Sequence, residues 1–170
     1  MNAPHKQKID ETILQQLAEH FGAAVMETHA AHGDLTAIVQ PDSIVEIIAW
    51  LKDEPGLEFN MLMDLCGVDY LPRQPRFEVV YHLYSLKHNH RLRIKVQLDG
   101  DKPEVPTITS LYKGANWFER EVWDMFGIKF AGHPDLRRIL LYEQFAGHPL
   151  RRDYPYDKRQ PIIEARTRHL

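Results

Sequence analysis

Cysteine is nearly absent from this sequence: Cys66 is the single cysteine among 170 residues. One thiol cannot form an internal disulfide. An iron–sulfur cluster held by this chain alone would need four cysteines, or two cysteines with two histidines. We therefore expect no self-held cluster, and a reducing compartment in which a free thiol persists.

Long hydrophobic runs are absent as well. The longest candidate, residues 44–51, is short and contains Glu46, whereas a membrane-spanning helix needs about 20 mainly apolar residues. The first ten residues have neither the apolar segment of a secretory signal nor the composition of an organelle presequence. The sequence predicts a chain that does not cross a membrane by itself.

Several cofactor motifs are missing. The chain has no G-x-G, hence no dinucleotide fingerprint, and no G-x-x-x-x-G-K-S/T phosphate loop. It has neither H-E-x-x-H nor C-x-x-C, so its ten histidines form no recognisable metal motif. A metal site of Glu121, Asp124 and His133 remains conceivable, because Glu121 and Asp124 share one face of a predicted helix.

The periodic segments that are present predict the fold. Apolar spacing predicts helices over residues 8–21, between Ser43 and Pro55, and over 114–125. Strands are predicted over 23–28, 35–40, 59–70, 77–86 and 91–98, with a central strand at 59–70, an antiparallel hairpin from the last two, and a polar loop at 100–106. This order predicts an α+β fold, a mixed or antiparallel sheet with helices packed on one face, followed by an extended C-terminal arm.

Charge and proline divide the chain into two parts. Residues 1–127 hold 12 basic and 19 acidic side chains, whereas residues 128–170 hold 9 basic and 5 acidic ones. Prolines recur after residue 127, and each disfavours helix at the residue before it. We predict an α+β body domain over residues 1–126 and an extended basic arm over 127–170 that wraps a partner subunit.

The densest group of chemically informative residues lies at 114–140. Glu119, Glu121 and Asp124 could form an acid–base pair for hydrolysis. However, Arg120 lies four residues before Asp124 on the same helix face, where such residues usually pair, and no nucleophile lies nearby. A docking role, in which the carboxylates pair with arginines, is favoured over catalysis.

The arm contains a near-repeat. Residues 131–138, A-G-H-P-D-L-R-R, resemble residues 146–153, A-G-H-P-L-R-R-D. Arginine pairs suit carboxylates or phosphates, because the guanidinium fork binds two oxygens at once. The negative total charge and the lack of an aromatic stacking platform disfavour nucleic acid. A protein partner is the better prediction for an arm so rich in apolar and aromatic residues.

Two stretches closely resemble the signature of one family. Residues 119–140, E-R-E-V-W-D-M-F-G-I-K-F-A-G-H-P-D-L-R-R-I-L, and residues 147–155, G-H-P-L-R-R-D-Y-P, are similar to the 30-kDa-type (C-type) subunit of respiratory complex I. The resemblance implies a peripheral-arm subunit of NADH–quinone oxidoreductase, a proton-translocating enzyme, on the cytoplasmic side of a bacterial inner membrane. It also implies that any membrane contact is indirect and that this chain has no catalytic, cofactor-binding or metal-binding residues. FMN, iron–sulfur clusters and quinone would belong to partner subunits.

The resemblance further implies the partners: chiefly the 49-kDa-type (D-type) subunit, with the B-type subunit that helps to form the quinone site and neighbouring cluster-bearing subunits, and no nucleic acid. Equivalent subunits of membrane-bound hydrogenases and of the photosynthetic NDH complex, where it is the J-type subunit, share the signature and remain alternatives. The residues expected to dock or to carry the signature are Trp117, Glu119, Arg120, Glu121, Trp123, Asp124, Gly127, Gly132, His133, Pro134, Leu136, Arg137, Arg138, Gly147, His148, Pro149, Arg151, Arg152 and Asp153.

Overall fold

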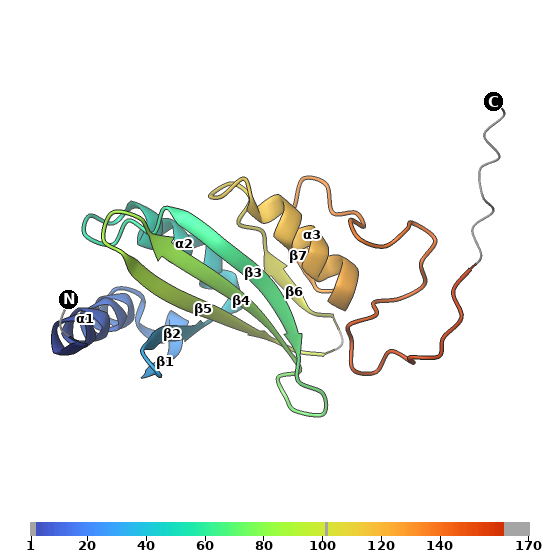
Figure 1. Cartoon of the computed structure of the whole chain (residues 1–170), viewed down its shortest axis with the longest axis horizontal. Coiled ribbons are helices and arrows are strands. Elements are labelled where there is room, and N and C mark those ends of the chain that lie inside the picture. Colours follow the sequence, from blue (N-terminus) through green and yellow to red (C-terminus); the bar gives the residue numbers. More distant parts are fainter. Residues whose placement is uncertain (1–2, 101, 162–170) are drawn as a thin grey trace.

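The computed structural model describes residues 3–100 and 102–161. A twisted sheet occupies the centre of an elongated molecule, and an irregular arm leaves it beside α3 (Figure 1). The helices are α1 (Ala3–Phe21), α2 (Ile44–Asp53) and α3 (Ala115–Phe126), with short 3-10 turns at η1 (Gly22–Ala24) and η2 (Pro41–Ser43). The strands are β1 (Val25–Ala31), β2 (Asp34–Val39), β3 (Met61–Asp69), β4 (Phe77–Ser85), β5 (His90–Leu98), β6 (Glu104–Pro106) and β7 (Lys129–Ala131).

The main sheet has the strand order β1-β2-β5-β4-β3. β2 and β5 run parallel, and the other neighbours are antiparallel. The predicted mixed α+β fold is thereby confirmed. The predicted hairpin is confirmed too, because β4 and β5 pair from Phe77 with Leu98 to Ser85 with His90.

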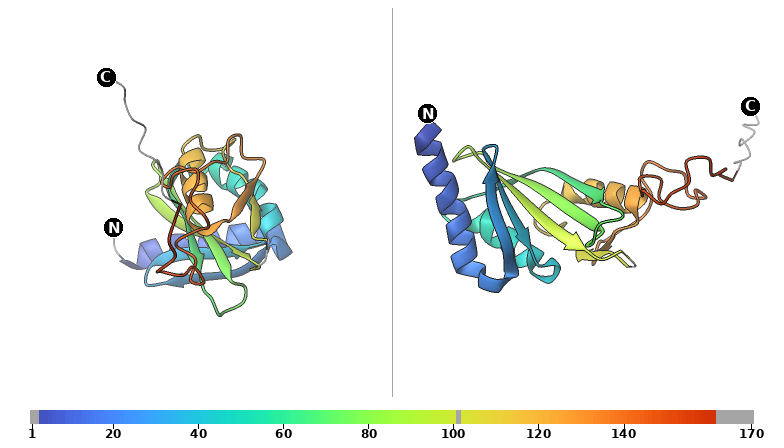
Figure 2. Two further views of the ribbon diagram at one scale, coloured as in Figure 1. Left: turned by 90° about the vertical axis from the view of Figure 1, so that its right-hand side faces the viewer. Right: turned by 90° about the horizontal axis from the view of Figure 1, so that it is seen from below.

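The helices cover one face of the sheet, and alternation in the strands explains why. The inward residues of β4 and β5 are almost fully buried, namely Phe77, Val79, Tyr81, Leu83, Leu92, Ile94, Val96 and Leu98. Leu17 of α1 and one stripe of α2, at Ile44, Ile47, Ile48 and Leu51, belong to the same core. α1 and α2 lie at the end of the molecule remote from the arm (Figure 2). None of the described helices is long and apolar enough to cross a membrane.

The other face of the sheet is polar. Arg91, Arg93, Lys95 and Gln97 alternate with the buried residues of β5 and are half-buried or exposed. Lys95 Nζ lies 2.8 Å from Glu78 Oε1 on the neighbouring strand. This face of β5 is therefore the more solvent-accessible side of the hairpin.

β3 is an edge strand, so the prediction of a central strand at residues 59–70 is wrong. The run is apolar for another reason: α3 packs directly on β3. A Cβ added to Gly67 would lie 2.9 Å from Phe126 Cδ2 and 3.0 Å from Val122 Cγ1. Contact with α3 therefore buries part of β3, and this burial explains an apolar composition that is also typical of a central strand.

A second, two-stranded sheet lies beside α3 and was not predicted. β6 and β7 pair in parallel, and each contributes one buried side chain, Val105 and Phe130. Three-residue strands are too short to show a period, which is why residues 100–106 were predicted as loop. The first residues of the predicted arm, 127–131, thus follow α3 into this sheet, and the irregular part of the arm is described from 132 to 161.

Candidate functional site

α3 and the arm are joined around one buried carboxylate, Asp124. Its side chain is fully buried. Asp124 Oδ1 lies 2.6 Å from Arg138 Nη1. Asp124 Oδ2 accepts the backbone N–H groups of Ile139, Leu140 and Leu141 at 3.0, 2.9 and 2.9 Å. Burial alone would raise the pKa of Asp124, but these amides and Arg138 together hold it below its usual range.

Arg138 extends the same network into the arm. It donates to the carbonyl oxygens of Phe145 and Gly147 at 2.8 and 3.0 Å. Its guanidinium also lies 5.7 Å from the ring centroids of both Trp123 and Phe145. Arg138 therefore serves contacts within the chain, and its charge is matched by Asp124.

Arg120 binds the arm instead of Asp124. Its Nε and Nη2 donate to the carbonyl oxygens of Arg137 and Arg138 at 3.1 and 2.9 Å, and its guanidinium lies 5.4 Å from the Trp117 ring. The expected pairing between Arg120 and Asp124 along the helix is thus replaced by bonds to the arm, which crosses this face of α3.

Glu119 is fully buried and is held by a hydroxyl and an amide rather than by an arginine, contrary to the sequence-based expectation. Glu119 Oε1 accepts the Ile108 N–H at 2.8 Å, and Oε2 accepts the Thr107 hydroxyl. A possible cationic partner, His133 Nε2, is 3.9 Å away. Burial raises the pKa of Glu119 to about 7, against the lowering effect of its hydrogen bonds.

The near-repeat attaches one histidine per copy to a carbonyl of α3. His133 Nε2–H donates to Asn116 O at 3.3 Å, while its Nδ1 accepts the Asp135 N–H at 3.0 Å. His148 Nδ1–H donates to Asp124 O at 3.0 Å. Because carbonyls only accept and amides only donate, these bonds fix the tautomers. Burial lowers the pKa of both imidazoles, so both rings are neutral at pH 7.

Gly127 ends α3 and makes room for one of these histidines. Its φ is +75°, in the left-handed region that favours glycine, and its N–H bonds to Trp123 O. A Cβ at this position would lie 2.7 Å from His148 Cδ2. The Gly127 in the signature is thereby explained by the close approach of the arm.

A second attachment point lies at the end of the hairpin that β3 and β4 form. Arg76 binds Asp69 through two hydrogen bonds, of 3.0 and 2.7 Å, and donates to Asp153 at 2.9 Å. The Arg152 N–H donates to Asp69 Oδ2 at 2.8 Å, and its guanidinium donates to Leu71 O at 2.8 Å. Burial opposes ionisation of Asp69, but Arg76 and the amides hold its pKa at about 2.

Sequence reasoning missed Asp69 and Arg76. Both residues are visible in the sequence, but their pairing can be predicted only from the register of β3 and β4. Asp69 is directly opposite Phe77 across the two strands, so Arg76 lies beside Asp69. Once a hairpin is drawn from 61 to 85, an acid and an arginine at its closed end become natural partners.

The predicted site residues divide by exposure. Buried members are Glu119, Arg120 and Asp124. Half-buried members are Trp123, Gly127, His133, Leu136, Arg138, Gly147, His148, Pro149 and Arg151. Exposed members are Trp117, Glu121, Gly132, Pro134, Arg137, Arg152 and Asp153.

The arrangement is poorly suited to hydrolysis. Both oxygens of Asp124 are used by Arg138 and three amides, whereas Glu121 is exposed. A general base needs a free oxygen within reach of substrate. Among the described residues, Glu121, Asp124 and His133 also do not form a group with metal-ligand geometry. What the site does is hold the arm on α3.

Comparisons with known proteins give a consistent result. Residues 37–160 match the protein family described as "Respiratory-chain NADH dehydrogenase, 30 Kd subunit". The chain is 56% identical over 135 residues to the NADH-quinone oxidoreductase C 2 subunit of Rhizobium meliloti, covering 79% of this chain and 74% of that protein. It is 50% identical over 144 residues to the corresponding C-type subunit of Roseiflexus, covering 85% and 83%.

Two solved structures are also similar. One is a trypsin-resistant fragment of Nqo5, residues 1–134, with a TM-score of 0.64 and 36% identity, covering 74% of this chain and 98% of that one. The other is a chain from an archaeal membrane-bound sulfane sulfur reductase, with a TM-score of 0.69 and 22% identity, covering 94% and 98%. The second likeness concerns the fold alone.

Proposed function

This chain belongs to the family of 30 kDa subunits of respiratory-chain NADH dehydrogenases, and from that premise we propose that it docks the quinone-site subunit of a proton-translocating NADH–quinone oxidoreductase. In this proposal it is a peripheral-arm subunit on the cytoplasmic face of a bacterial inner membrane. FMN, iron–sulfur clusters and quinone are held by its partners, and electrons pass from NADH to quinone without using residues of this chain.

The observation that carries the docking proposal is the difference in exposure between charged and apolar side chains of α3 and the arm. Asp124, Arg138 and Arg120 are used for contacts within the chain, whereas several large apolar side chains are exposed. Trp117 is 61% exposed, Leu140 63%, Leu150 55% and Tyr156 fully exposed. Side chains of this kind, outside a core, are typical of surfaces that a partner covers.

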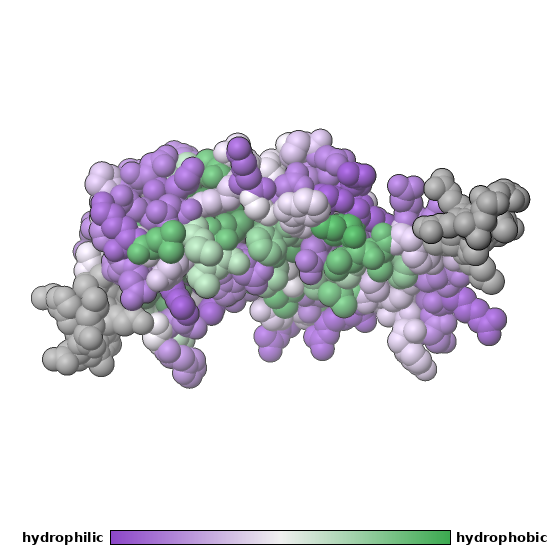
Figure 3. Space-filling view, turned by 45° about the horizontal axis from the view of Figure 1, so that its top comes forward, coloured by the Kyte–Doolittle hydropathy of each residue, from purple (hydrophilic) through white to green (hydrophobic). Residues whose placement is uncertain are grey.

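The surface view agrees with a role in assembly. Hydrophobic surface forms an interrupted band along the long axis of the molecule and continues toward the end that carries the arm (Figure 3). We propose that the 49-kDa-type (D-type) subunit covers the arm end, with the B-type subunit and cluster-bearing subunits as further neighbours.

Exchange of one exposed arm residue tests the proposal. Leu140→Ser should weaken co-purification of the chain with the other subunits from native membranes, because a desolvated apolar contact is lost. NADH–quinone reductase activity of those membranes should fall with it. Leu86→Ser is the matched control, since Leu86 is also 63% exposed but lies in the turn between β4 and β5.

Two results would contradict the proposal. Unchanged assembly and activity with Leu140→Ser combined with Trp117→Ala would remove the arm as docking surface. Loss of co-purification and of reductase activity caused by Leu86→Ser alone would place the contact at the hairpin turn instead.

A related membrane complex is the second candidate. Membrane-bound hydrogenases and the photosynthetic NDH complex have equivalent subunits with the same signature, which favours keeping these alternatives. The subunits that co-purify with the chain distinguish these: a flavin-bearing NADH-oxidising partner supports the quinone reductase, and a hydrogenase partner contradicts it.

A further inference from the structure

Three side chains of different chemistry meet on the open face of the sheet, away from α3 and the arm. Asp64 and Cys66 lie two residues apart on β3, and His82 of β4 is paired with Asp64 across the strands. Residues two apart on a strand project from the same face, and a cross-strand partner joins them there. A carboxylate oxygen of Asp64, Cys66 Sγ and an imidazole nitrogen of His82 all lie within 4.8 Å of one another.

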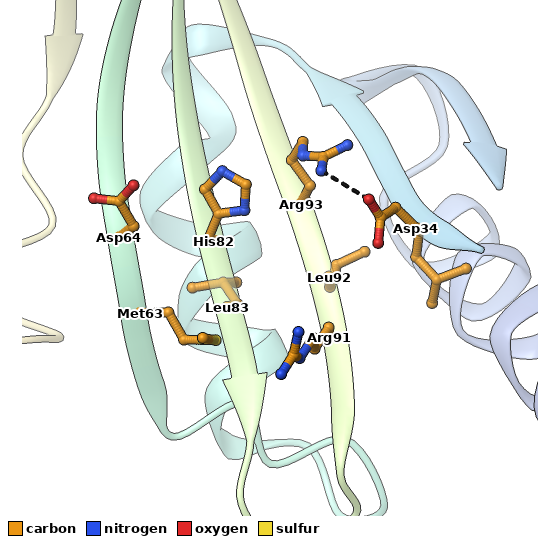
Figure 4. Close-up of a pocket in the computed structure, with 9 residues that line it drawn as sticks. Asp34, Met63, Asp64, His82, Leu83, Arg91, Leu92 and Arg93 are labelled. Atoms are coloured by element: carbon orange, nitrogen blue, oxygen red, sulfur yellow. Dashed lines mark hydrogen bonds and ion pairs between the residues drawn. The ribbon is translucent and has the colours of Figure 1, made fainter. Parts of the chain in front are cut away.

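The group lies beside a groove. A cavity of about 340 Å³ is lined by Asp64 and His82 together with Asp34, Met63, Arg91 and Arg93. Figure 4 shows Asp64, His82 and Arg93 side by side on three neighbouring strands, with the dashed ion pair joining Arg93 to Asp34. Two of the three donors, Asp64 and His82, therefore border a space that solvent or another ligand can enter.

We propose that Asp64, Cys66 and His82 bind one Zn²⁺ ion. Thiolate, imidazole and carboxylate form the mixed sulfur, nitrogen and oxygen set that Zn²⁺ accepts, whereas Mg²⁺ and Ca²⁺ prefer oxygen ligands alone. Three protein ligands leave the fourth tetrahedral position for water or an outside ligand.

The donor atoms are available for this role. Asp64 Oδ1 accepts the Leu65 N–H at 2.9 Å, which leaves Oδ2 for the metal. A metal ion binds the neutral form of the His82 imidazole through a ring nitrogen. On binding, the Cys66 thiol releases its proton to solvent and the thiolate coordinates the ion.

Two of the neighbouring positive charges are paired with carboxylates. Arg93 lies 3.1 Å from Asp34 Oδ2 and Lys95 lies 2.8 Å from Glu78 Oε1. Their repulsion of a divalent cation is therefore reduced, and the Asp64 carboxylate with the Cys66 thiolate supplies two negative charges to the ion. Bound there, Zn²⁺ joins the edge strand β3 to β4.

Titration of the full-length, tag-free chain tests the site. We expect one Zn²⁺ per chain by calorimetry, and a higher melting temperature with the ion because it binds the folded state. With Co²⁺ as probe, a thiolate-to-cobalt charge-transfer band should appear. Asp64→Asn, Cys66→Ser and His82→Asn should each weaken Zn²⁺ binding by at least about tenfold, and Cys66→Ser should also abolish the band.

His32→Asn is the matched control. His32 is exposed in the turn between β1 and β2 with φ of +57°, which asparagine adopts readily, so Zn²⁺ affinity should not change. The proposal is overturned by no binding, by binding that all three ligand variants retain, or by a Co²⁺ spectrum without the thiolate band. Asp64 is exposed, so Asp64→Asn decides alone if another variant does not fold.

Discussion

At the residue scale, the buried carboxylates of this chain differ because their partners differ. Asp69 and Asp124 face arginines and several amides, which hold their pKa values low despite burial. Glu119 is equally buried but receives one hydroxyl and one amide. Without a strong cationic partner, burial dominates its pKa. In the sequence these carboxylates look alike, and their surroundings decide their protonation.

Asp124→Asn should destabilise the fold by about 3–5 kcal/mol, because it leaves a charged Arg138 whose side chain is only 13% exposed. Urea denaturation measures the change. Glu121→Gln on the exposed face of the same helix should stay within about 0.5 kcal/mol of the parent chain. In the double variant Asp124→Asn with Arg138→Gln, the loss should be smaller than the sum of the single losses. Equal small effects of Asp124→Asn and Glu121→Gln would contradict this interpretation.

Glu119 should make stability fall as the pH rises. A carboxyl whose folded pKa is about 7, against an ordinary 4.5, holds its proton better when folded. Its contribution is complete below pH 4.5 and is lost as the pH approaches 7. Since other carboxylates act in the opposite sense, the measurement is the difference in unfolding free energy between Glu119→Gln and the parent chain. That difference should shift in favour of glutamine across this window. A difference that does not vary with pH refutes it.

At the element scale, α3 is the piece to which both copies of the near-repeat bind. His133 bonds to Asn116 O near its start, and His148 bonds to Asp124 O near its end. The two G-H-P segments are thus two attachments along one helix. This is why the arm has a repeat but no helical or strand period: its regularity comes from the helix it covers.

Gly127→Ala should be more destabilising than Gly132→Ala. Both glycines have positive φ, +75° and +79°, so the backbone strain is alike. Only at Gly127 does the new Cβ meet an atom at 2.7 Å, in His148, whereas at Gly132 the nearest is Thr107 Cγ2 at 3.5 Å. Thermal denaturation compares the two variants. Adding His148→Ala to Gly127→Ala should restore the part of the thermal stability that the clash removes. Equal losses of thermal stability in the two glycine variants would show that no clash exists.

At the scale of the whole molecule, a body with a continuous core carries an irregular arm with two ion-paired fastenings, beside the hydrogen bonds that Arg120, His133 and His148 add. The fastenings are the Asp124–Arg138 pair and the Asp69–Arg76–Asp153 group. Segments of this kind open locally at low cost compared with a packed sheet. The arm is therefore the part of the chain whose exposure a partner should change most.

Brief treatment with trypsin should cut after Arg137 before it cuts after Lys87, as mass spectrometry of the fragments would reveal. Their side chains are similarly exposed, 69% and 65%, but Lys87 lies in the turn of a paired hairpin whereas Arg137 lies in the arm. Asp124→Asn should add early cleavage after Arg138. Equal rates at Arg137 and Lys87 would indicate that the arm is as firmly held as the sheet.

Periodicity in the sequence predicted the longer helices and strands of this protein, but not the three-residue strands β6 and β7. Alternation identified the hairpin, and helical spacing identified the three helices, because periodicity reports which side of a segment is buried. The edge position of β3, the pairing of β2 with β5, and the partners of Asp69, Asp124 and Glu119 depend instead on tertiary contacts. The grouping of Asp64, Cys66 and His82 also depends on tertiary contacts, because it requires β3 and β4 to pair in this register. These contacts depend on where distant parts of the chain return in space, and no local period encodes that.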